Sequence, residues 1–256
     1  MGGSLVLLLD YDGTLTPIVR NPSAALISKG MRSVLTRLAA QKRITLGILS
    51  GRKLSEIRRL VGIPGILYGG NHGFELWIGG RKKVLAQAKR FLPLMRMLSK
   101  ELSRQLGGFP NAWVEDKGIT LSVHYRRCSA AKAERVLTIC RRLTDPWETK
   151  RRIRVTRGKK VYEIRPAIKW DKGKAVEFLL KQMPHSARDR FIVYIGDDTT
   201  DEDAFSAVKR KRGWAIRVGG SREKTKASYF LDGVVQARRF LTLLSRMETN
   251  DVSRGC

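Results

Sequence analysis

The sequence predicts an α/β protein whose core, built on a parallel sheet, is interrupted by an inserted α+β unit. Apolar runs at residues 5–9, 44–49 and 191–195 suit strands buried on both faces, as in a parallel sheet. Each run ends at polar residues and leads toward a segment with helical periodicity. Between residues 81 and 166 the pattern changes, because a helix followed by a hairpin occurs twice. This repeat indicates a separate α+β domain.

The charge is strongly positive. The 256 residues include 51 Lys and Arg against 23 Asp and Glu, a formal net charge of +28, which in principle attracts polyanions. The basic residues are spread over helix-like segments, and the densest stretch, residues 141–160, holds nine basic residues and one aromatic, Trp147. Since single-stranded nucleic acid binding needs aromatic stacking surfaces, we expect binding to nucleic acid to be at most non-specific.

Location and partners follow from what the sequence lacks. No apolar run approaches the ~20 residues of a membrane span, so we expect no membrane partner. Cys128, Cys140 and Cys256 show no metal-type spacing and are odd in number, which favours free thiols in a reducing compartment. We therefore expect a cytoplasmic protein, and we also expect it to be a monomer.

Two carboxylates follow the first strand. Asp10 and Asp12 lie two positions apart, so both side chains point toward one crevice at the carboxyl end of the strand. This edge of an open α/β sheet is where ligands bind. Such a pair favours a cation, although Asp-x-Asp-Gly by itself is also compatible with an ordinary acidic turn.

The second strand ends in a possible anion site. Ser28 is expected to cap a helix over residues 31–39, and the strand at 44–49 then ends at Ser50-Gly51-Arg52, just before a helix at 54–60. A hydroxyl, a glycine and an arginine at a strand-to-helix junction suit an oxyanion, because backbone N–H groups and the helix dipole converge there. An ordinary capped turn is the alternative.

A glycine-rich loop comes next. A short strand at residues 66–68 runs into Gly69-Gly70-Asn71-His72-Gly73, and a further strand is expected at 74–77. The glycines allow backbone to approach a ligand, so we predict Asn71 and His72 as substrate contacts. A purely structural histidine is the alternative.

The inserted unit presents one polar sheet face. Helices are expected at residues 85–106 and 133–143, and hairpins at 112–126 and 153–165. Alternation directs the apolar side chains of the strands toward the helices and leaves polar ones on the other face. A solvated face is one interpretation, and a site for a polyhydroxyl ligand is another. The candidate residues for such a site are Glu115, Lys117, Arg126 and Glu163.

The chain then returns to the α/β pattern. Asp171-Lys172-Gly173 begins a helix, where a lysine is unfavourable for the dipole unless it faces an anion. The strand at 191–195 is followed by five acids within residues 197–203, which repel one another unless cations offset them. Strands at 214–218 and 229–231 and a helix at 234–247 complete the chain.

These strand ends together indicate phosphoryl transfer. All-oxygen ligands suit Mg²⁺, which takes one or two carboxylates plus substrate phosphate. Ser50 and Lys172 add anion-binding groups. One aspartate can act as nucleophile through an aspartyl-phosphate, while a second transfers protons to and from the reacting oxygens.

Several motifs resemble those of a known family. They include Gly70-Asn71-His72-Gly73, Val114-Glu115-Asp116-Lys117-Gly118, Glu163-Ile164-Arg165-Pro166, and the run from Gly196 to Asp203. In their order and spacing they resemble the haloacid dehalogenase-type phosphatases and, more narrowly, the trehalose-6-phosphate phosphatases. The resemblance implies a Rossmann-like haloacid dehalogenase core with a C2-type cap. Its expected divisions are core 1–80, cap 81–166 and core 167–256.

The resemblance also implies residue roles and an activity, the Mg²⁺-dependent hydrolysis of trehalose 6-phosphate. Asp10 would be the nucleophile and Asp12 the general acid and base. The implied contacts are as follows: Mg²⁺ with Asp10, the Asp12 carbonyl and Asp197; metal-bound water or Lys172 with Asp198 and Asp201; the phosphoryl group with Ser50, Lys172 and the nearby Arg52; and sugar hydroxyls with Glu115, Lys117, Arg126 and Glu163.

Two alternatives stay open. A phosphatase for sucrose 6-phosphate or another phosphosugar shares the core and differs in the cap, and Val161 stands where some family members carry a basic residue. A non-catalytic polyanion-binding protein on the same fold would be expected to have lost acids at the strand ends. None of these acids is lost.

Overall fold

The computed structural model describes residues 4–19, 24–158, 160–183, 190–220 and 224–247. The chain folds as two compact units. The first combines Met1–Lys83 with Trp170–Cys256, and the second is the intervening Val84–Lys169. Among the described residues, no helix has both the length and the apolar character needed to cross a membrane.

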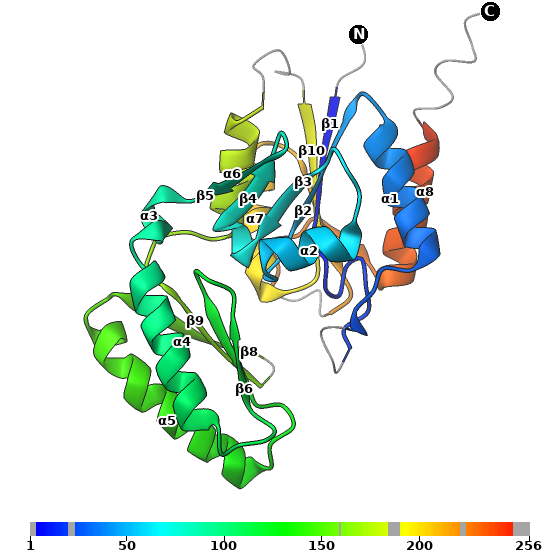
Figure 1. Cartoon of the computed structure of the whole chain (residues 1–256). Helices are drawn as coiled ribbons and strands as arrows, with labels where there is room; N and C mark the ends of the chain where they lie inside the picture. Colours follow the sequence, from blue (N-terminus) through cyan, green and yellow to red (C-terminus); the bar gives the residue numbers. More distant parts are fainter. Residues whose placement is uncertain (1–3, 20–23, 159, 184–189, 221–223, 248–256) are drawn as a thin grey trace, which may run out of the picture. The chain divides into compact units, whose positions relative to one another are not determined.

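A large sheet forms the centre of the first unit (Figure 1). The pairings from β12 through to β3 are parallel, and β4 pairs antiparallel with β3. The central strands are apolar on both faces because helices cover both faces, which confirms the predicted α/β fold class. In sheet order the strands are β12 (Tyr229–Leu231), β11 (Trp214–Val218), β10 (Arg190–Gly196), β1 (Ser4–Leu9), β2 (Ile44–Leu49), β3 (Leu67–Gly70), β4 (Glu75–Ile78) and β5 (Arg81–Val84).

Strand β5 is not predicted by the apolar pattern, because its sequence is Arg-Lys-Lys-Val. It follows β4 through Gly79 and Gly80, whose φ angles of 56° and 76° match the positive-φ turn that favours glycine in hairpins. The strand lies at the edge of the sheet, where exposed basic side chains discourage pairing with other chains. Its formation depends on pairing with β4 and not on burial of its own side chains.

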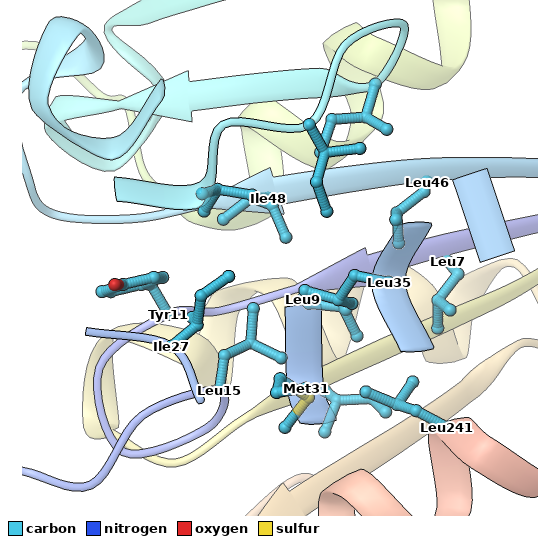
Figure 2. Close-up of a cluster of buried hydrophobic side chains, with 14 of the residues drawn as sticks. Leu7, Leu9, Tyr11, Leu15, Ile27, Met31, Leu35, Leu46, Ile48 and Leu241 are labelled. Carbon is cyan, nitrogen blue, oxygen red and sulfur yellow. The ribbon is translucent and has the colours of Figure 1, made fainter. Parts of the chain in front are cut away.

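Helices cover both faces of this sheet. On one side lie α1 (Lys29–Ala40), α2 (Leu54–Val61) and α8 (Val234–Met247), and on the other α6 (Lys172–Lys181) and α7 (Glu202–Arg210). Figure 2 shows the hydrophobic cluster on the first of these two sides, where Leu7 and Leu9 of β1 pack with Met31 and Leu35 of α1. The predicted cap is confirmed, because Ser28 Oγ accepts a hydrogen bond from the Met31 backbone N–H at 3.1 Å.

The second unit packs its helices on one face of an antiparallel sheet (Figure 1). The helix expected over 85–106 is divided, since Pro93 has no N–H and is tolerated only in a first helical turn, so that α4 starts beside it. The strands follow the order β6-β7-β9-β8. The elements are α3 (Ala86–Lys89), α4 (Leu92–Leu106), β6 (Trp113–Asp116), β7 (Leu121–His124), α5 (Ala130–Thr149), β8 (Ile153–Gly158) and β9 (Val161–Pro166).

Candidate active site

The register of the parallel strands gathers the strand-end residues. Leu9 of β1 pairs with Ile48 of β2 and with Ile195 of β10. The residues that follow each strand, Asp10, Ser50 and Asp197, therefore meet at one edge of the sheet. The Asp10 backbone N–H, for example, donates to the Ile195 carbonyl at 2.8 Å.

A buried lysine joins two of the acids. Lys172 is 3% exposed, and its Nζ lies 2.6 Å from Asp10 Oδ1 and 2.6 Å from Asp201 Oδ1. Burial alone would lower the pKa of Lys172, but the two carboxylates raise it, so the ammonium stays charged. The helix-start lysine predicted to face an anion does so, because Asp171 caps the helix N-terminus and Lys172 turns into the site.

Asp201 is an anchor for this lysine. Its Oδ1 accepts from Lys172 and from the Tyr194 hydroxyl at 2.6 Å, and its Oδ2 accepts from the backbone N–H groups of Asp197 at 3.1 Å and Asp198 at 3.0 Å. A carboxylate has about four acceptor sites, so these bonds occupy the group. Tyr194 was not predicted as a site residue. The available signal was a tyrosine in a fully buried strand, since its hydroxyl needs a partner.

Three acids at this edge form a candidate metal centre. Carboxylate oxygens of Asp10, Asp197 and Asp201 all lie within 4.8 Å of one another. Burial and the neighbouring acids raise the pKa of Asp10 well above its usual range, although Lys172 opposes this, and burial raises the pKa of Asp197 to about 7. Asp197 Oδ1 is buried, and no group of the described residues forms a hydrogen bond with it. Since Asp201 is occupied, Asp10 and Asp197 are the pair that fits a small, hard cation.

Gly13 makes room for this pair. Its φ of 83° favours glycine, and a Cβ at this position would lie 2.1 Å from Asp197 Oδ2. The turn after β1 therefore brings its backbone directly against the Asp197 carboxylate. Glycine is therefore needed at position 13 both for the positive φ and for the space that the Asp197 carboxylate occupies.

Asp12 is held by Arg52. The guanidinium donates to both carboxylate oxygens, Nε to Oδ2 and Nη2 to Oδ1, each at 2.7 Å, and Nη1 donates to Glu56 Oε1 at 2.5 Å. The Arg52 side chain is buried, while 40% of the Asp12 side chain is exposed. The Arg52 backbone N–H also donates to Ser50 Oγ at 3.1 Å, so the predicted anion site and the acid pair are directly connected.

The loop after β3 has an unusual backbone. Asn71, His72 and Gly73 have φ angles of 51°, 56° and 89°. The Asn71 amide donates to Glu75 Oε2 at 2.7 Å, and both side chains are buried. The His72 ring packs against Gly51, where a Cβ would lie 2.7 Å from His72 Cε1. These two predicted substrate contacts therefore support the loop beside Ser50.

The side chain of Asp198 has a different role from the acids that surround Lys172. The residue is exposed, and its Oδ1 accepts from the Thr199 backbone N–H at 2.7 Å. The carboxylate caps the short helix η3 (Thr199–Asp201). In the described structure it contributes to the site through its backbone N–H, which donates to Asp201.

The second unit gathers most of the predicted sugar-binding residues on one sheet face. Glu115 pairs across the strands with Ser122, and Ser122 with Glu163, so the two acids share a row. Glu163 lies 2.5 Å from Arg165 Nη2 and 3.8 Å from Lys117 Nζ. Arg126 instead lies in the turn that follows β7 and is half-buried there.

Comparison with known proteins identifies the family. The family model described as trehalose-phosphatase matches residues 8–235, which is most of the chain. The chain belongs to the trehalose-phosphatase family. This confirms the resemblance inferred from the motifs and the predicted enzyme class, a phosphatase.

Curated relatives match nearly the whole chain. The chain is 39% identical over 259 residues to probable trehalose-phosphate phosphatase D of Arabidopsis thaliana and 38% identical over 246 residues to trehalose-phosphate phosphatase of Mycobacterium tuberculosis. The matches cover 95% and 94% of this chain but 68% and 61% of the two relatives. The chain thus spans about two thirds of the length of the curated relatives that it matches.

Solved structures share the fold. The C-terminal domain of trehalose-6-phosphate phosphatase from C. albicans superposes with a TM-score of 0.79 at 26% identity, covering 95% of this chain and 93% of that one. A haloacid dehalogenase-like hydrolase from Bacteroides thetaiotaomicron has a TM-score of 0.64 at 18% identity, covering 94% and 99% of the two chains. The second likeness shows the fold alone, which is the haloacid dehalogenase-like one that the motifs predict.

Proposed function

We propose that this protein hydrolyses trehalose 6-phosphate to trehalose and phosphate through an aspartyl-phosphate on Asp10. The observation that carries the proposal is the Lys172 ammonium held between Asp10 and Asp201 at 2.6 Å from each. This contact places a fixed positive charge beside the carboxylate that must stay ionised to attack phosphorus. The family supplies the substrate class, and the site supplies the residues for the chemistry.

In the first step, an Asp10 oxygen forms a bond to phosphorus while the bond from phosphorus to the sugar oxygen breaks. Lys172 and Ser50 hold the phosphoryl oxygens on which negative charge is concentrated. Because Lys172 is anchored by Asp201, and Asp201 by Tyr194 and two backbone N–H groups, the ammonium is oriented before substrate arrives.

Asp12 then serves the leaving group. In its protonated form, Asp12 gives its proton to the departing sugar oxygen; it later takes a proton from the water that attacks the aspartyl-phosphate, which releases phosphate, restores Asp10 and returns Asp12 to its protonated form. Both Asp12 oxygens accept from Arg52 in the described structure. One Asp12 oxygen must therefore give up its hydrogen bond with Arg52 in order to reach the sugar oxygen. A phosphoryl oxygen of the substrate can then accept from the Arg52 guanidinium in its place.

We propose Asp10, Asp197 and the Asp12 carbonyl as the ligands of Mg²⁺. The orphaned Asp197 Oδ1 and the raised pKa of both carboxylates support a cation at this position. When bound, the cation neutralises charge on the phosphoryl group and favours the ionised form of Asp10. Asp201 and Asp198 then act as supports and not as ligands.

The second unit, Val84–Lys169, is proposed as the cap that selects the sugar. Glu115, Glu163 and Lys117 offer fixed acceptors and donors on one sheet face, and Arg126 lies near the end of that sheet. Sugar hydroxyls need both kinds of group. Sucrose 6-phosphate or another phosphosugar is the alternative substrate, since the same kinds of group would serve it.

A phosphate-release panel tests the proposal. The substrates are trehalose 6-phosphate, sucrose 6-phosphate, glucose 6-phosphate, p-nitrophenyl phosphate and a short 5′-phosphorylated oligonucleotide, each with and without Mg²⁺. We expect the highest kcat/KM on trehalose 6-phosphate and dependence on Mg²⁺. Asp10→Asn should abolish release from every substrate, whereas Asp232→Asn, which changes an exposed acid after β12 that has no assigned role, should retain it. Preference for another phosphosugar, or residual turnover by Asp10→Asn, would contradict the proposal.

The expected cytoplasmic location, monomeric state and non-specific interaction with nucleic acid stay predictions. The positive charge should attract an anionic substrate, so kcat/KM should fall with ionic strength more than kcat does. Saturable binding of an oligonucleotide at ~0.15 M salt would instead show that the charge serves a nucleic-acid partner.

A further inference from the structure

An exposed tryptophan lies on the polar sheet face of the second unit. Trp113 is 43% exposed and precedes Glu115 by two positions on β6, so both side chains point to the same face. Single exposed apolar side chains are common on proteins and need no explanation by themselves. Trp113 differs from such side chains because its ring lies among charged residues on the same sheet face.

The orientation of the ring is fixed by its neighbours. Trp113 pairs across the strands with His124, and their rings stack with centroids 4.7 Å apart and planes 13° apart. His124 Nε2 in turn donates to Glu115 Oε2 at 2.7 Å, since the carboxylate can only accept. The indole, the imidazole and the Glu115 carboxylate therefore form one connected group.

This group continues a row of polar side chains. Glu115 shares its cross-strand row with Ser122 and Glu163, and Glu163 contacts Arg165 and Lys117. One face thus carries a flat apolar ring beside two carboxylates and two cations. Ligand sites that orient small molecules combine an apolar surface with a few fixed polar groups in this way.

We infer that Trp113 is a stacking platform for a pyranose ring of the substrate and so helps to determine sugar specificity. This inference rests on the proposed function, and it adds a residue that the motif resemblance does not assign. A pyranose has an apolar C–H face and hydroxyls around its rim, which matches an indole flanked by acceptors and donors. His124 holds the platform, and Glu115 then reaches the hydroxyls at its edge.

Trp214 offers a matched control. It is 42% exposed, close to the value for Trp113, and it also contacts other rings, Phe191 at 5.1 Å and Tyr229 at 5.2 Å between centroids. It begins β11, so it lies at the amino end of a parallel strand, opposite the edge that carries Asp10. Loss of this ring removes an exposed indole of the first unit and leaves every residue of the second unit unchanged.

The experiment compares Trp113→Ala, Trp113→Phe and Trp214→Ala on trehalose 6-phosphate and on p-nitrophenyl phosphate. We expect Trp113→Ala to raise KM for the sugar phosphate by about three- to tenfold, which corresponds to the energies found for pairs of stacked aromatic side chains, and to leave KM for the aryl phosphate unchanged. Trp113→Phe keeps a ring and should recover part of the loss. Trp214→Ala should leave KM unchanged for both substrates.

A cross-strand aromatic pair can also stabilise a hairpin, so a second measurement is needed that loss of folding cannot mimic. In Trp214→Phe protein, added trehalose should change the tryptophan emission, and the further change Trp113→Phe should reduce this response, to which only Trp77, Trp147 and Trp170 can then contribute. Equal losses on both substrates by Trp113→Ala, or an emission response as large in the double variant as in Trp214→Phe, would overturn the inference.

Failure of the proposed function is distinguishable from failure of this inference. If the wild type releases no phosphate from trehalose 6-phosphate, the same comparison is made on the phosphosugar that it hydrolyses best. A selective KM increase there supports the platform although the substrate assignment is wrong. Unchanged KM on that phosphosugar overturns the platform as well.

Discussion

Replacing Asp201 by Asn should destabilise the protein far more than its single change of charge suggests. The residue is fully buried and accepts from Lys172, Tyr194 and two backbone N–H groups. An asparagine keeps one acceptor oxygen, but its NH₂ group must face either the two backbone N–H groups or the Lys172 ammonium, none of which can accept, so only the Tyr194 hydroxyl is available to it as an acceptor. Lys172 also loses one of its two carboxylate partners.

The expected cost follows from this geometry. Removing one partner of a buried ion pair typically costs about 3–5 kcal/mol, and we expect a value near 3 kcal/mol because Asp10 still pairs with Lys172. Tyr194→Phe removes one of the donors to the same carboxylate and should cost about 1–3 kcal/mol. Asp198→Asn should change stability by at most ~0.5 kcal/mol, since this residue is exposed and asparagine caps helices as well as aspartate does.

Urea denaturation of the metal-free protein, followed by far-UV circular dichroism, measures these differences. With slopes of about 1–3 kcal/mol per M, a loss of about 3 kcal/mol moves the midpoint of the core transition by about 1–3 M. The predicted order of destabilisation is Asp201→Asn, then Tyr194→Phe, then Asp198→Asn. If Asp201→Asn stayed within about 1 kcal/mol of wild type, Asp201 would not be the anchor of Lys172.

Four further predictions concern activity, stability and metal binding. Asp12→Asn should slow release of a sugar alcohol by at least about 100-fold while an activated aryl phosphate suffers less, because only the poor leaving group needs a proton; equal losses in steady-state assays would exclude the acid role. The pKa of Asp197 is raised to about 7 from an ordinary 3.8, so its contribution to stability is fully present below about pH 4 and is lost as pH rises through 7. At pH 8 and without metal, the folded protein must hold this carboxylate in its ionised form. Asp197→Asn removes that charge and should therefore raise Tm. In thermal scans at about a hundred times Kd, Mg²⁺ should stabilise the wild type by about 2.7 kcal/mol but not Asp197→Asn; an equal shift in both would remove Asp197 from the metal site. Glu163→Gln should raise KM for trehalose 6-phosphate by about tenfold and spare p-nitrophenyl phosphate, because the contact proposed for Glu163 is with the sugar and not with the phosphoryl group; losses shared by both substrates would assign Glu163 to the fold.

Much of the fold could be predicted because it depends on local pattern. Runs such as residues 5–9 and 191–195 are apolar without alternation, which only a strand buried on both faces requires. The carboxyl ends of parallel strands meet at one edge, so the acids after these runs could be assigned to one site before their distances were known. The motif order around them was enough to indicate the family that the comparisons confirm.

Elements whose stability comes from a neighbour were missed. Strand β5 has a basic sequence and exists because β4 and the Gly79-Gly80 turn present it to the sheet edge. The division of α3 from α4 follows from Pro93, which an apolar helical pattern does not register. Neither feature has an apolar periodicity of its own.

The sequence by itself determined which residue types stand at the strand ends, and hence the family and the chemistry. Only the tertiary structure decided how those residues pair: Lys172 with Asp10, 162 positions away, Asp12 with Arg52, and the Tyr194 hydroxyl with Asp201. Periodicity reports only which face of a strand or helix a side chain occupies. Hydrogen bonds between distant residues depend on strand register and rotamers, which are set when the whole core packs.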